Sequence, residues 1–531
     1  MSNHMTEKPL RIILFLCNWG PHAAYDSLQD TGYRIPFEIR MVRIPCTGRI
    51  SKALLFKAFE MGADGVALVG CGAGSCRYGT GTRTAEKNTE DTQNILKLLG
   101  LGRDRMRLAS FLPDDSDGLQ AFLAEFYADI KTLGKSPVEP LPRILPDGHP
   151  SLQAAVSRRD VVLCQDCGKC TASCPLALSG KAFSPRKLVG DILHGELTAS
   201  IKQDIHACLT CGICHERCPS DINFPEFVRD VRTCLHPYDT DGRHQPHGGF
   251  FQSMMRTLAS PSLTPDHWAF LPESIQTDSS SKTLFFGGCA PYFDAFFKNH
   301  NPVDTTAILT DSLRLMNFFD VHPRVLNTER CCGHDLLWSG DVENFRRLAR
   351  LNVDMLQDLG IETVITSCPE CYHTLAVEYG KHGIHPHFTV THLYEFLETE
   401  IDKGAVTFTP LPHQITYQDS CRLNRIEDIR DYPRKLIKRL STAGFQEMTD
   451  SGLSALCCGN CAWSACGATN KALQVKRLRQ AHDTGSDLLV TSCPKCKIHL
   501  RCAMEDPFLG HELHMEMADL TQILARTIAW E

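Results

Sequence analysis

The amino-acid sequence predicts a multidomain α/β protein. At 531 residues the chain is too long for a single hydrophobic core, which favours three or four domains. Short apolar runs alternate with amphipathic stretches near both ends, and 26 cysteines gather in spaced motifs. We expect a Rossmann-like α/β domain at 1–136, a helical cysteine-rich domain with its connector at 151–280, and two duplicated α/β domains at 281–410 and 411–531.

Composition narrows the class of protein. An apolar content of 43% and a charged content of 22% are ordinary for a globular protein, and the net charge of -7 gives no basic surface for nucleic acid. No apolar run approaches the ~20 residues that span a bilayer. The run Ile12–Cys17 has no signal-peptide cleavage pattern, so we expect a cytoplasmic protein. Without an export signal, the cysteines are expected to be metal ligands or redox groups.

The first domain alternates strands and helices, which predicts a parallel sheet with helices on both faces. In the helix expected at 51–62, Leu54, Leu55, Ala58 and Phe59 share one apolar face, and Gly62 ends the helix. The predicted strands are 11–17, 37–45, 65–71 and 106–111, and the other predicted helices are 82–99 and 116–133.

Four cysteines of this domain lie just past the ends of predicted strands: Cys17, Cys46, Cys71 and Cys76. Loops at the carboxyl edge of a parallel sheet converge, and ligands bind there. Four thiolates that meet at this edge suit a [2Fe-2S] cluster. The alternative is four unrelated cysteines in the core.

The motifs around these cysteines carry a resemblance. Cys17-Asn-Trp19, Pro45-Cys46-Thr-Gly-Arg49, 57–65 and Gly70-Cys71-Gly-Ala-Gly-Ser-Cys76 resemble the delta, iron–sulfur subunit of methyl-viologen-reducing hydrogenases. The resemblance implies a [2Fe-2S] cluster that passes electrons from a hydrogenase or formate dehydrogenase to a flavoprotein. The family usually has Cys-Asn-Trp-Cys, and here Gly20 replaces the second cysteine.

Five prolines between Pro137 and Pro150 predict an extended spacer, and two cysteine runs follow it. Each run reads C-x2-C-x2-C-x3-C-P, the pattern of bacterial two-cubane ferredoxins, in which the fourth cysteine ligates the other cluster. Two zinc ribbons are the alternative, but zinc needs only paired C-x2-C knuckles. We therefore assign two [4Fe-4S] cubanes, one to Cys164, Cys167, Cys170 and Cys218, and the other to Cys208, Cys211, Cys214 and Cys174.

Between the runs, Ser184-Pro185 predicts a helix start, with Leu188, Val189, Ile192 and Leu193 as a face that covers the clusters. A second such helix is expected at 223–234. The domain is similar to the C subunit of heterodisulfide reductase, a two-cubane electron carrier. The segment 236–282 is read as a solvated connector with a short docking helix at 250–258, although histidines 236, 244 and 247 also suggest a metal site.

The C-terminal half is an internal duplication. Cys331-Cys332-Gly333 corresponds to Cys457-Cys458-Gly459, and Cys368-Pro-Glu-Cys371 corresponds to Cys493-Pro-Lys-Cys496. Each CPxC motif follows an apolar strand and precedes a helix, so its thiols should lie near a helix N-terminus that favours thiolate. Amphipathic helices at 341–359 and 472–484 should precede these strands.

Each half has five motif cysteines, one more than a cubane needs, which suggests an expanded cluster. The pattern resembles the CCG domains found in the B subunit of heterodisulfide reductase. The resemblance implies a non-cubane [4Fe-4S] cluster in each half and cleavage of a substrate disulfide between the two clusters. The implied ligands, which we take as the catalytic cysteines, are Cys289, Cys331, Cys332, Cys368 and Cys371, and Cys421, Cys457, Cys458, Cys493 and Cys496.

The other residues of interest are weaker candidates. His334, His373 and His499 lie beside these motifs and could donate protons near neutral pH. The four cysteines outside the motifs are expected to be packing residues: Cys234, Cys461, Cys466 and Cys502.

In the order of its motifs the chain resembles a fusion of three subunits that surround the flavin-containing A subunit of heterodisulfide reductase. No G-x-G-x-x-G follows a predicted strand, so FAD is expected only on such a flavoprotein partner. We expect an oxidoreductase acting on a sulfur group, which moves electrons between a flavoprotein, hydrogenase or formate dehydrogenase partner and a thiol–disulfide couple. The alternative is an electron-transfer hub without its own substrate.

Overall fold

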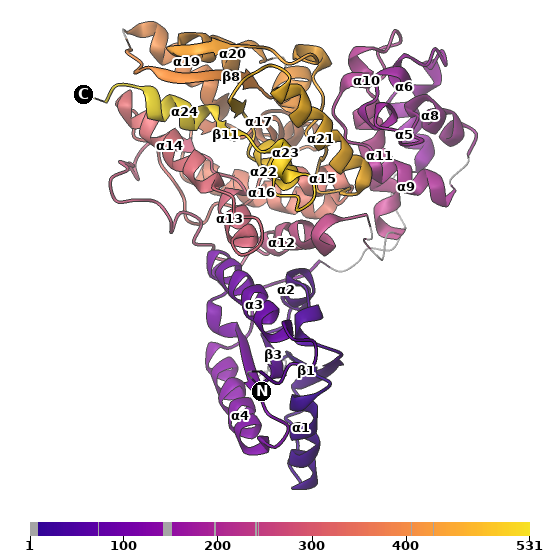
Figure 1. Ribbon diagram of the computed structural model, residues 1–531, viewed down its shortest axis with the longest axis vertical. Helices are drawn as coiled ribbons and strands as arrows, with labels where there is room; N and C mark the ends of the chain where they lie inside the picture. Colours follow the sequence, from indigo (N-terminus) through magenta and orange to yellow (C-terminus); the bar gives the residue numbers. More distant parts are fainter. Residues whose placement is uncertain are drawn as a thin grey trace, which may run out of the picture. The chain divides into compact units, whose positions relative to one another are not determined.

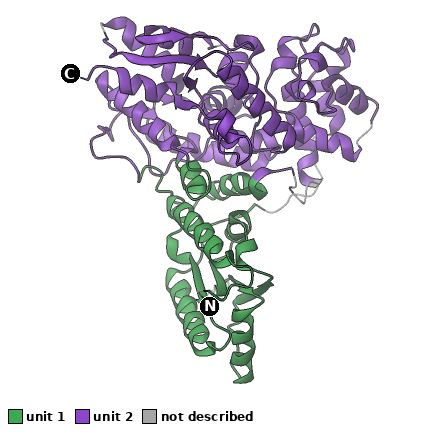
Figure 2. Cartoon of the chain, in the orientation of Figure 1, with its two compact units in different colours: residues 1–141, 247–269, 291–302 green, residues 142–246, 270–290, 303–531 purple. Residues whose placement is uncertain are grey.

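A computed structural model describes residues 9–72, 74–141, 151–195, 198–238, 242, 244–404, 406–427 and 429–530 (Figure 1). The chain forms two compact units (Figure 2). The first takes in residues 1–141, 247–269 and 291–302, and the second takes in 142–246, 270–290 and 303–531. A multidomain α/β protein with parallel sheets is therefore confirmed.

The first unit contains a four-stranded parallel sheet of order β2-β1-β3-β4. Its central strands are buried because their residues are almost continuously apolar, as expected for strands covered on both faces. All four predicted strands are present: β1 (Ile12–Cys17), β2 (Ile39–Ile44), β3 (Gly65–Cys71) and β4 (Met106–Phe111).

Helices cover both faces of this sheet. The helices α1 (Gly20–Asp30) and α4 (Ser116–Leu133) pack together over one face, and α2 (Lys52–Glu60) and α3 (Gly81–Leu98) pack together as a second pair. The Ser51 hydroxyl caps α2 by accepting a hydrogen bond from the Leu54 amide at 3.3 Å.

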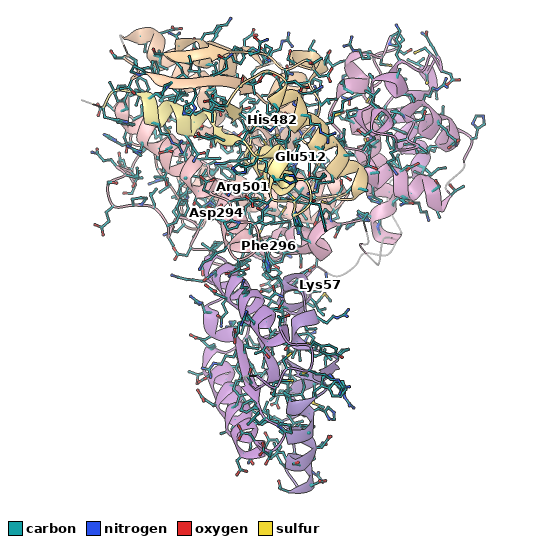
Figure 3. All side chains as sticks on the ribbon, in the orientation of Figure 1. Lys57, Asp294, Phe296, His482, Arg501 and Glu512 are labelled. Atoms are coloured by element: carbon teal, nitrogen blue, oxygen red, sulfur yellow. The ribbon has the colours of Figure 1, made fainter. Side chains whose placement is uncertain are left out.

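The predicted apolar face of α2 is wrong at one position. Leu54 is 46% exposed, and Phe56 is buried instead. The reason lies far along the chain, because α12 (Phe250–Leu258), the predicted docking helix, packs on α2 with Phe250 5.1 Å from Phe56 between ring centroids. Phe296 of α13 (Ala290–Phe297), labelled in Figure 3, joins this aromatic cluster at 4.5 Å from Phe250.

The connector is more ordered than its composition suggests. His247 lies edge-on to Phe251, Phe296 and Phe297, and His244 stacks on His206 at 3.7 Å. A solvated stretch was therefore the wrong expectation for these two histidines, because aromatic rings cover them. Within the described ranges, no histidine of the connector belongs to a cluster of metal-ligand atoms.

In the second unit, the two cysteine runs adopt the same backbone turns. Asp166 and Thr210, each just before the second cysteine of its run, have φ of 49° and 43°. Gly168 and Gly212, each before the third cysteine, have φ of 76° and 85°, a left-handed conformation that favours glycine. The equal spacing in sequence therefore becomes an equal loop geometry.

Short helices surround these loops. The predicted start at Ser184 is present, since its hydroxyl accepts a hydrogen bond from the Lys187 amide at 3.3 Å. The helices are α5 (Leu152–Arg158), α6 (Lys169–Ser173), α7 (Pro175–Leu178), α8 (Pro185–Leu193), α9 (Ala199–Ala207), α10 (Ile213–Glu216) and α11 (Phe224–Leu235).

The duplicated halves form two parallel sheets with matching strand order. The first is β5 (Thr283–Phe285), β6 (Thr363–Thr366) and β7 (Thr389–His392). The second has the order β11-β10-β8-β9, with β8 (Leu411–Tyr417), β9 (Thr442–Phe445), β10 (Leu488–Thr491) and β11 (Glu516–Asp519). The repeated motifs therefore correspond to a repeated sheet, extended by β9 in the second half.

The predicted helices before and after β6 and β10 are also present. They are α16 (Val342–Asp358) with α17 (Pro369–His373), and α21 (Ala468–His482) with α22 (Pro494–Met504). The remaining α-helices of the described ranges are α14 (Thr305–Phe318), α15 (His334–Ser339), α18 (Tyr379–Lys381), α19 (Leu393–Lys403), α20 (Asp431–Arg439), α23 (Gly510–Leu513) and α24 (Leu520–Thr527). Over the same ranges, no helix combines the length and the apolar character needed to cross a membrane.

Candidate metal centres

The four cysteines of the first unit converge at the carboxyl edge of its sheet. The Sγ atoms of Cys17 and Cys71 are 3.6 Å apart. Gly81, at the start of α3, lies between the other two, because a Cβ added there would be 2.6 Å from Cys46 Sγ and 2.9 Å from Cys76 Sγ. A glycine is required for this close approach, and the resulting set of four thiols fits an iron–sulfur centre.

The electrostatics at this edge differ from thiol to thiol. Burial raises the pKa of Cys17 to about 11, and burial also raises the pKa of Cys46. Burial acts against ionisation of Cys76 too, but the backbone N–H groups of Tyr78, Thr82 and Gly81 outweigh it and lower its pKa. The start of α3 therefore favours a thiolate, the form that binds a metal.

Gly20, which stands where the family usually has a cysteine, lies next to the end of β4. The atoms nearest to a Cβ added at Gly20 would be Phe111 O at 3.2 Å and two ring carbons of Pro113, at the end of β4. A cysteine at this position would therefore point toward the end of β4.

The two cysteine runs of the second unit are unequally buried. Cys174, Cys208, Cys211 and Cys214 are buried, whereas Cys167 is exposed and Cys164, Cys170 and Cys218 are half-buried. Burial, together with the nearby thiols of Cys211 and Cys208, raises the pKa of Cys174 to about 12. Cys174, the fourth cysteine of the first run, therefore lies near two thiols of the second run.

The second run lies against the segment that follows Cys421. Arg425 Nε donates to Cys211 O at 2.7 Å, and Arg422 Nη1 donates to Thr210 O at 3.2 Å. Thr210 Oγ1 donates to the Sγ of Cys461 at 2.9 Å. Cys461 is therefore a hydrogen-bond acceptor in a polar cluster, whereas the sequence suggested a packing residue.

The five motif cysteines of the first half lie close together, three of them buried and two of them, Cys289 and Cys368, half-buried. The Sγ atoms of Cys289 and Cys331 are 2.8 Å apart, and a Cβ added to Gly288 would be 2.7 Å from Cys371 Sγ. Hydrogen bonds with the thiols of Cys332 and Cys368, followed by burial, hold the pKa of Cys371 well above its ordinary value.

The five motif cysteines of the second half form an equivalent site. A hydrogen bond with Cys457, followed by burial, raises the pKa of Cys421. Hydrogen bonds with Cys457 and Cys496 lower the pKa of Cys458 to about 6, and its Sγ lies 3.3 Å from His499 Nδ1. Cys493 is the neighbour of Cys496 in the same group of thiols.

A buried ion pair joins the two CPxC loops. Glu370 and Lys495 occupy the equivalent variable position of the two motifs, and Lys495 Nζ lies 2.5 Å from Glu370 Oε2. Lys495 also pairs with Asp335, and His334 Nδ1 lies 2.9 Å from Asp335 Oδ1. Because the two loops are related by the duplication, this pair marks the place where the two halves meet.

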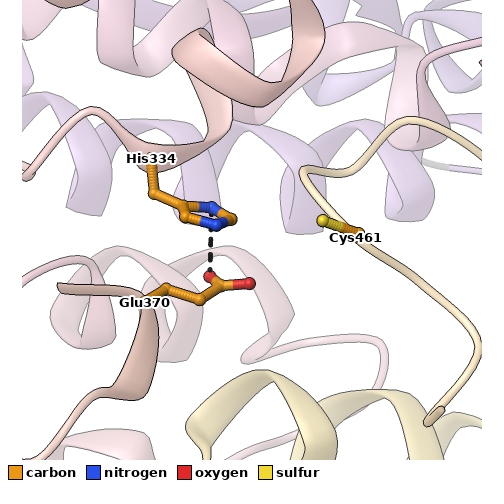
Figure 4. A group of neighbouring side chains, drawn as sticks. All are labelled: His334, Glu370 and Cys461. Carbon is orange, nitrogen blue, oxygen red and sulfur yellow. Dashed lines mark ion pairs between the residues drawn. The ribbon is translucent and has the colours of Figure 1, made fainter. Parts of the chain in front are cut away.

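Glu370 of this pair also lies close to His334 and Cys461, and the ligand atoms of the three residues are within 4.8 Å of one another (Figure 4). Two of the three already have cationic partners, since Lys495 binds Glu370 and Arg422 Nη2 donates to Cys461 Sγ at 3.2 Å. Two members of this group are therefore already in contact with cationic side chains.

The three predicted proton donors differ in environment. Burial lowers the pKa of His334, and burial lowers the pKa of His499 to about 3. Burial also opposes the charge on His373, but hydrogen bonds to Glu378, at 3.0 Å, and to Glu427 outweigh it and raise its pKa. Of the three, His373 is the one whose environment favours protonation.

Comparison with known proteins places these sites in known families. Residues 12–134 match the family described as methyl-viologen-reducing hydrogenase, delta subunit. Residues 163–223 match the 4Fe-4S dicluster domain, and residues 283–376 and 415–501 each match the cysteine-rich CCG domain.

Individual proteins from methanogens are similar to the same parts of the chain. Over 381 residues the chain is 28% identical to the D subunit of dihydromethanophenazine:CoB–CoM heterodisulfide reductase from Methanosarcina acetivorans, a match that covers 65% of this chain and 90% of the relative. It is 25% identical to the B subunit of fumarate reductase (CoM/CoB) from Methanothermobacter marburgensis, over 67% of this chain and 71% of the relative.

A third relative matches the first domain. The D-type iron–sulfur subunit of the F420-non-reducing hydrogenase vhu from Methanocaldococcus jannaschii is 32% identical over 128 residues, which are 24% of this chain and 96% of the relative. Through residues 12–134 the chain therefore belongs to the hydrogenase delta-subunit family, and it continues as an iron–sulfur protein with a dicluster domain and two CCG domains related to heterodisulfide reductase.

Proposed function

We propose that this chain is the electron-transfer and disulfide-reducing subunit of a heterodisulfide-reductase-like complex. The observation that carries the proposal is the pairing of two complete five-cysteine sites across the Glu370–Lys495 ion pair. An electron relay alone would need one site after the cubanes. Two equivalent sites suit a reaction that takes two electrons, such as reduction of a disulfide to two thiols.

The cysteine sets fit clusters by number, thiol chemistry and proximity. Cys17, Cys46, Cys71 and Cys76 would hold a [2Fe-2S] cluster, the two runs would hold cubanes in the crossed assignment, and each five-cysteine site would hold a non-cubane [4Fe-4S] cluster. When bound, such clusters supply one-electron transfer.

The side chains between the two five-cysteine sites support this chemistry. Reduction of a disulfide consumes two electrons and two protons and releases two thiols, so negative charge and proton demand both rise there. Lys495 and Arg422 lie in this region, and their positive charges would favour nascent thiolates. Despite burial, hydrogen bonds to Glu378 and Glu427 raise the pKa of His373, which favours its protonated form as a proton donor.

The first unit is proposed to receive electrons from a partner. Its family membership favours, as the partner, an FAD flavoprotein like the A subunit of heterodisulfide reductase, which would itself receive electrons from a hydrogenase or formate dehydrogenase. Tyr78, in the loop after Cys76, is 56% exposed, and Arg77 lies 3.9 Å from the Trp19 ring beside Cys17. This aromatic and cationic edge next to the thiols suits docking of such a partner.

Disulfide turnover with a reduced dye tests the function. Protein purified anaerobically should hold about eighteen irons, two in the first unit and sixteen in the second, and little zinc. With reduced methyl viologen it should release two thiols per disulfide for every two electrons consumed. A fully loaded protein that reoxidises with a redox partner but releases no thiol from any disulfide tested would instead be an electron-transfer hub.

Replacing Cys71 or Cys76 with serine should remove the [2Fe-2S] signal from low-temperature electron paramagnetic resonance spectra. Serine keeps the size of the side chain but loses the thiolate ligand. The matched control is Cys502→Ser, a half-buried cysteine outside the motifs, which should leave every signal in place. If the Cys71 and Cys76 variants keep an unchanged spectrum, the first unit is a docking scaffold and electrons enter elsewhere.

A further inference from the structure

Three arginines around the second cysteine run are buried without an acidic partner. Arg232, Arg422 and Arg425 are 0%, 1% and 8% exposed, and over the described ranges none has a carboxylate oxygen within 4.0 Å of its nitrogens. Two other arginines behave differently: Arg229, which is buried, pairs with Glu378 at 2.8 Å, and Arg434, which is half-buried, pairs with Asp419 at 2.7 Å.

Hydrogen bonds from the three guanidinium groups go to the backbone of the cysteine run. Arg232 Nη2 donates to Cys208 O at 2.7 Å, Arg422 donates to Thr210 O, and Arg425 donates to Cys211 O. These carbonyl oxygens accept hydrogen bonds but do not neutralise the positive charge. A guanidinium buried without a counter-charge is strongly unfavourable, so an anion should be present nearby.

Thiols lie close to these guanidinium groups. Cys208 and Cys461 support the charge of Arg232 against burial. Cys461 and Cys421 act most strongly on Arg422, ahead of the more distant carboxylates of Glu370 and Glu378. Thiolates bound to an iron–sulfur cluster keep a net negative charge on the site as a whole. Such a site supplies the counter-charge that the three arginines lack.

Two of the three arginines, Arg422 and Arg425, have no counterpart in the first of the duplicated halves. Arg422 and Arg425 follow Cys421, whereas the equivalent stretch after Cys289 reads Ala-Pro-Tyr-Phe and contains no cation. The first cysteine run also differs from the second, since Arg159 beside it pairs with Asp230 at 2.8 Å and Arg186 pairs with Asp166 at 3.2 Å. Two sites therefore have unneutralised cations, and two do not.

We propose that Arg232, Arg422 and Arg425 are the counter-charges of two sites, the one formed by Cys208, Cys211, Cys214 and Cys174 and the five-cysteine site of the second half. They raise the reduction potentials of these two sites above those of the first run and of the five-cysteine site of the first half. The inference rests on the proposed function only in requiring that the cysteine sets hold clusters. The two duplicated halves are then unequal, and the second is reduced first at equilibrium.

A redox titration followed by electron paramagnetic resonance tests this in the full-length, cluster-loaded chain. Loss of a signal in Cys332→Ala or in Cys458→Ala assigns each midpoint to the first or second half. The second half should have the higher midpoint. Arg422→Gln and Arg425→Gln should each lower the midpoint potential of the second half by at least about 59 mV, which is a tenfold change in the equilibrium constant of a one-electron reduction. The midpoint potential of the first half should change less.

Two controls separate charge from structure. Arg434→Gln removes an equally positive side chain from the same half, but one already neutralised by Asp419, so the midpoints should move less than in Arg422→Gln. Arg422→Lys keeps the charge and should keep a near-normal midpoint. Iron content and thermal unfolding are measured for each variant. If Arg422→Gln loses its clusters, the test relies on Arg425→Gln, because Arg425 is the least buried of the three arginines.

The proposal is overturned if the first half has the equal or higher midpoint, if Arg422→Lys shifts the midpoint as far as Arg422→Gln, or if all sites shift alike. None of these outcomes depends on disulfide turnover. A chain that reduces no disulfide can still show the predicted order of potentials, and an active chain can still contradict it.

Discussion

Replacement of either Cys332 or Cys458 with alanine should abolish disulfide turnover and leave the cubane signals reducible by dye. Each residue is the second cysteine of its CCG motif and is itself buried within a group of five thiols. A disulfide accepts two electrons, and each five-cysteine site would hold a one-electron centre. With one site damaged, the remaining site can deliver a single electron, which does not complete the reaction.

The comparison between the two variants makes this result specific. Both variants leave Cys164 to Cys218 untouched, so signals from the cubanes should be as intense as in the unmodified protein. Steady-state thiol release should fall below about one thousandth of the original rate, an activation cost of at least about 4 kcal/mol. Near-normal turnover in either variant, with the other half intact, would refute a two-site mechanism and favour the hub.

The order and location of most elements could be predicted from sequence. The strand ending at Cys17 and the strand ending at Cys71 are apolar runs bounded by turn residues, so local pattern alone decided them. The loops of the two cysteine runs followed from equal spacing and from Gly168 and Gly212, which permit the left-handed turns. Such features depend on neighbouring residues and are readable without a partner segment.

What could not be predicted depends on contacts between distant segments. Leu54 and Phe56 are both apolar and lie on one helix, and only the docking of α12 decides which of them is buried. Cys461 lies outside the duplicated motifs, so nothing in the sequence indicated that Thr210 would donate to it. The opposite charges at Glu370 and Lys495 were visible in the repeat, but their pairing requires the two halves to face each other.

The Glu370–Lys495 pair leads to the second large expected effect, which concerns stability. Lys495→Met should destabilise the second unit by about 3–5 kcal/mol, because Asp335 and Glu370 would be left buried with their charges uncompensated. Burial opposes the charge on Lys495, but the two carboxylates outweigh it and hold its pKa well above the ordinary value. The pair is thus charged at neutral pH. The measurement is the midpoint of thermal unfolding of the cluster-loaded protein.

Lys497→Met is the matched control. Lys497 lies on the same helix and is equally buried, and it pairs with Asp304 at 2.6 Å, but that carboxylate is about half exposed and water can replace the lost partner. Its loss should cost less than about half as much. Adding Asp335→Asn and Glu370→Gln to Lys495→Met removes the stranded charges, so the triple variant should regain most of the lost stability. If the triple variant is as unstable as Lys495→Met alone, packing of the lysine stem, and not the buried charge, joins the two halves.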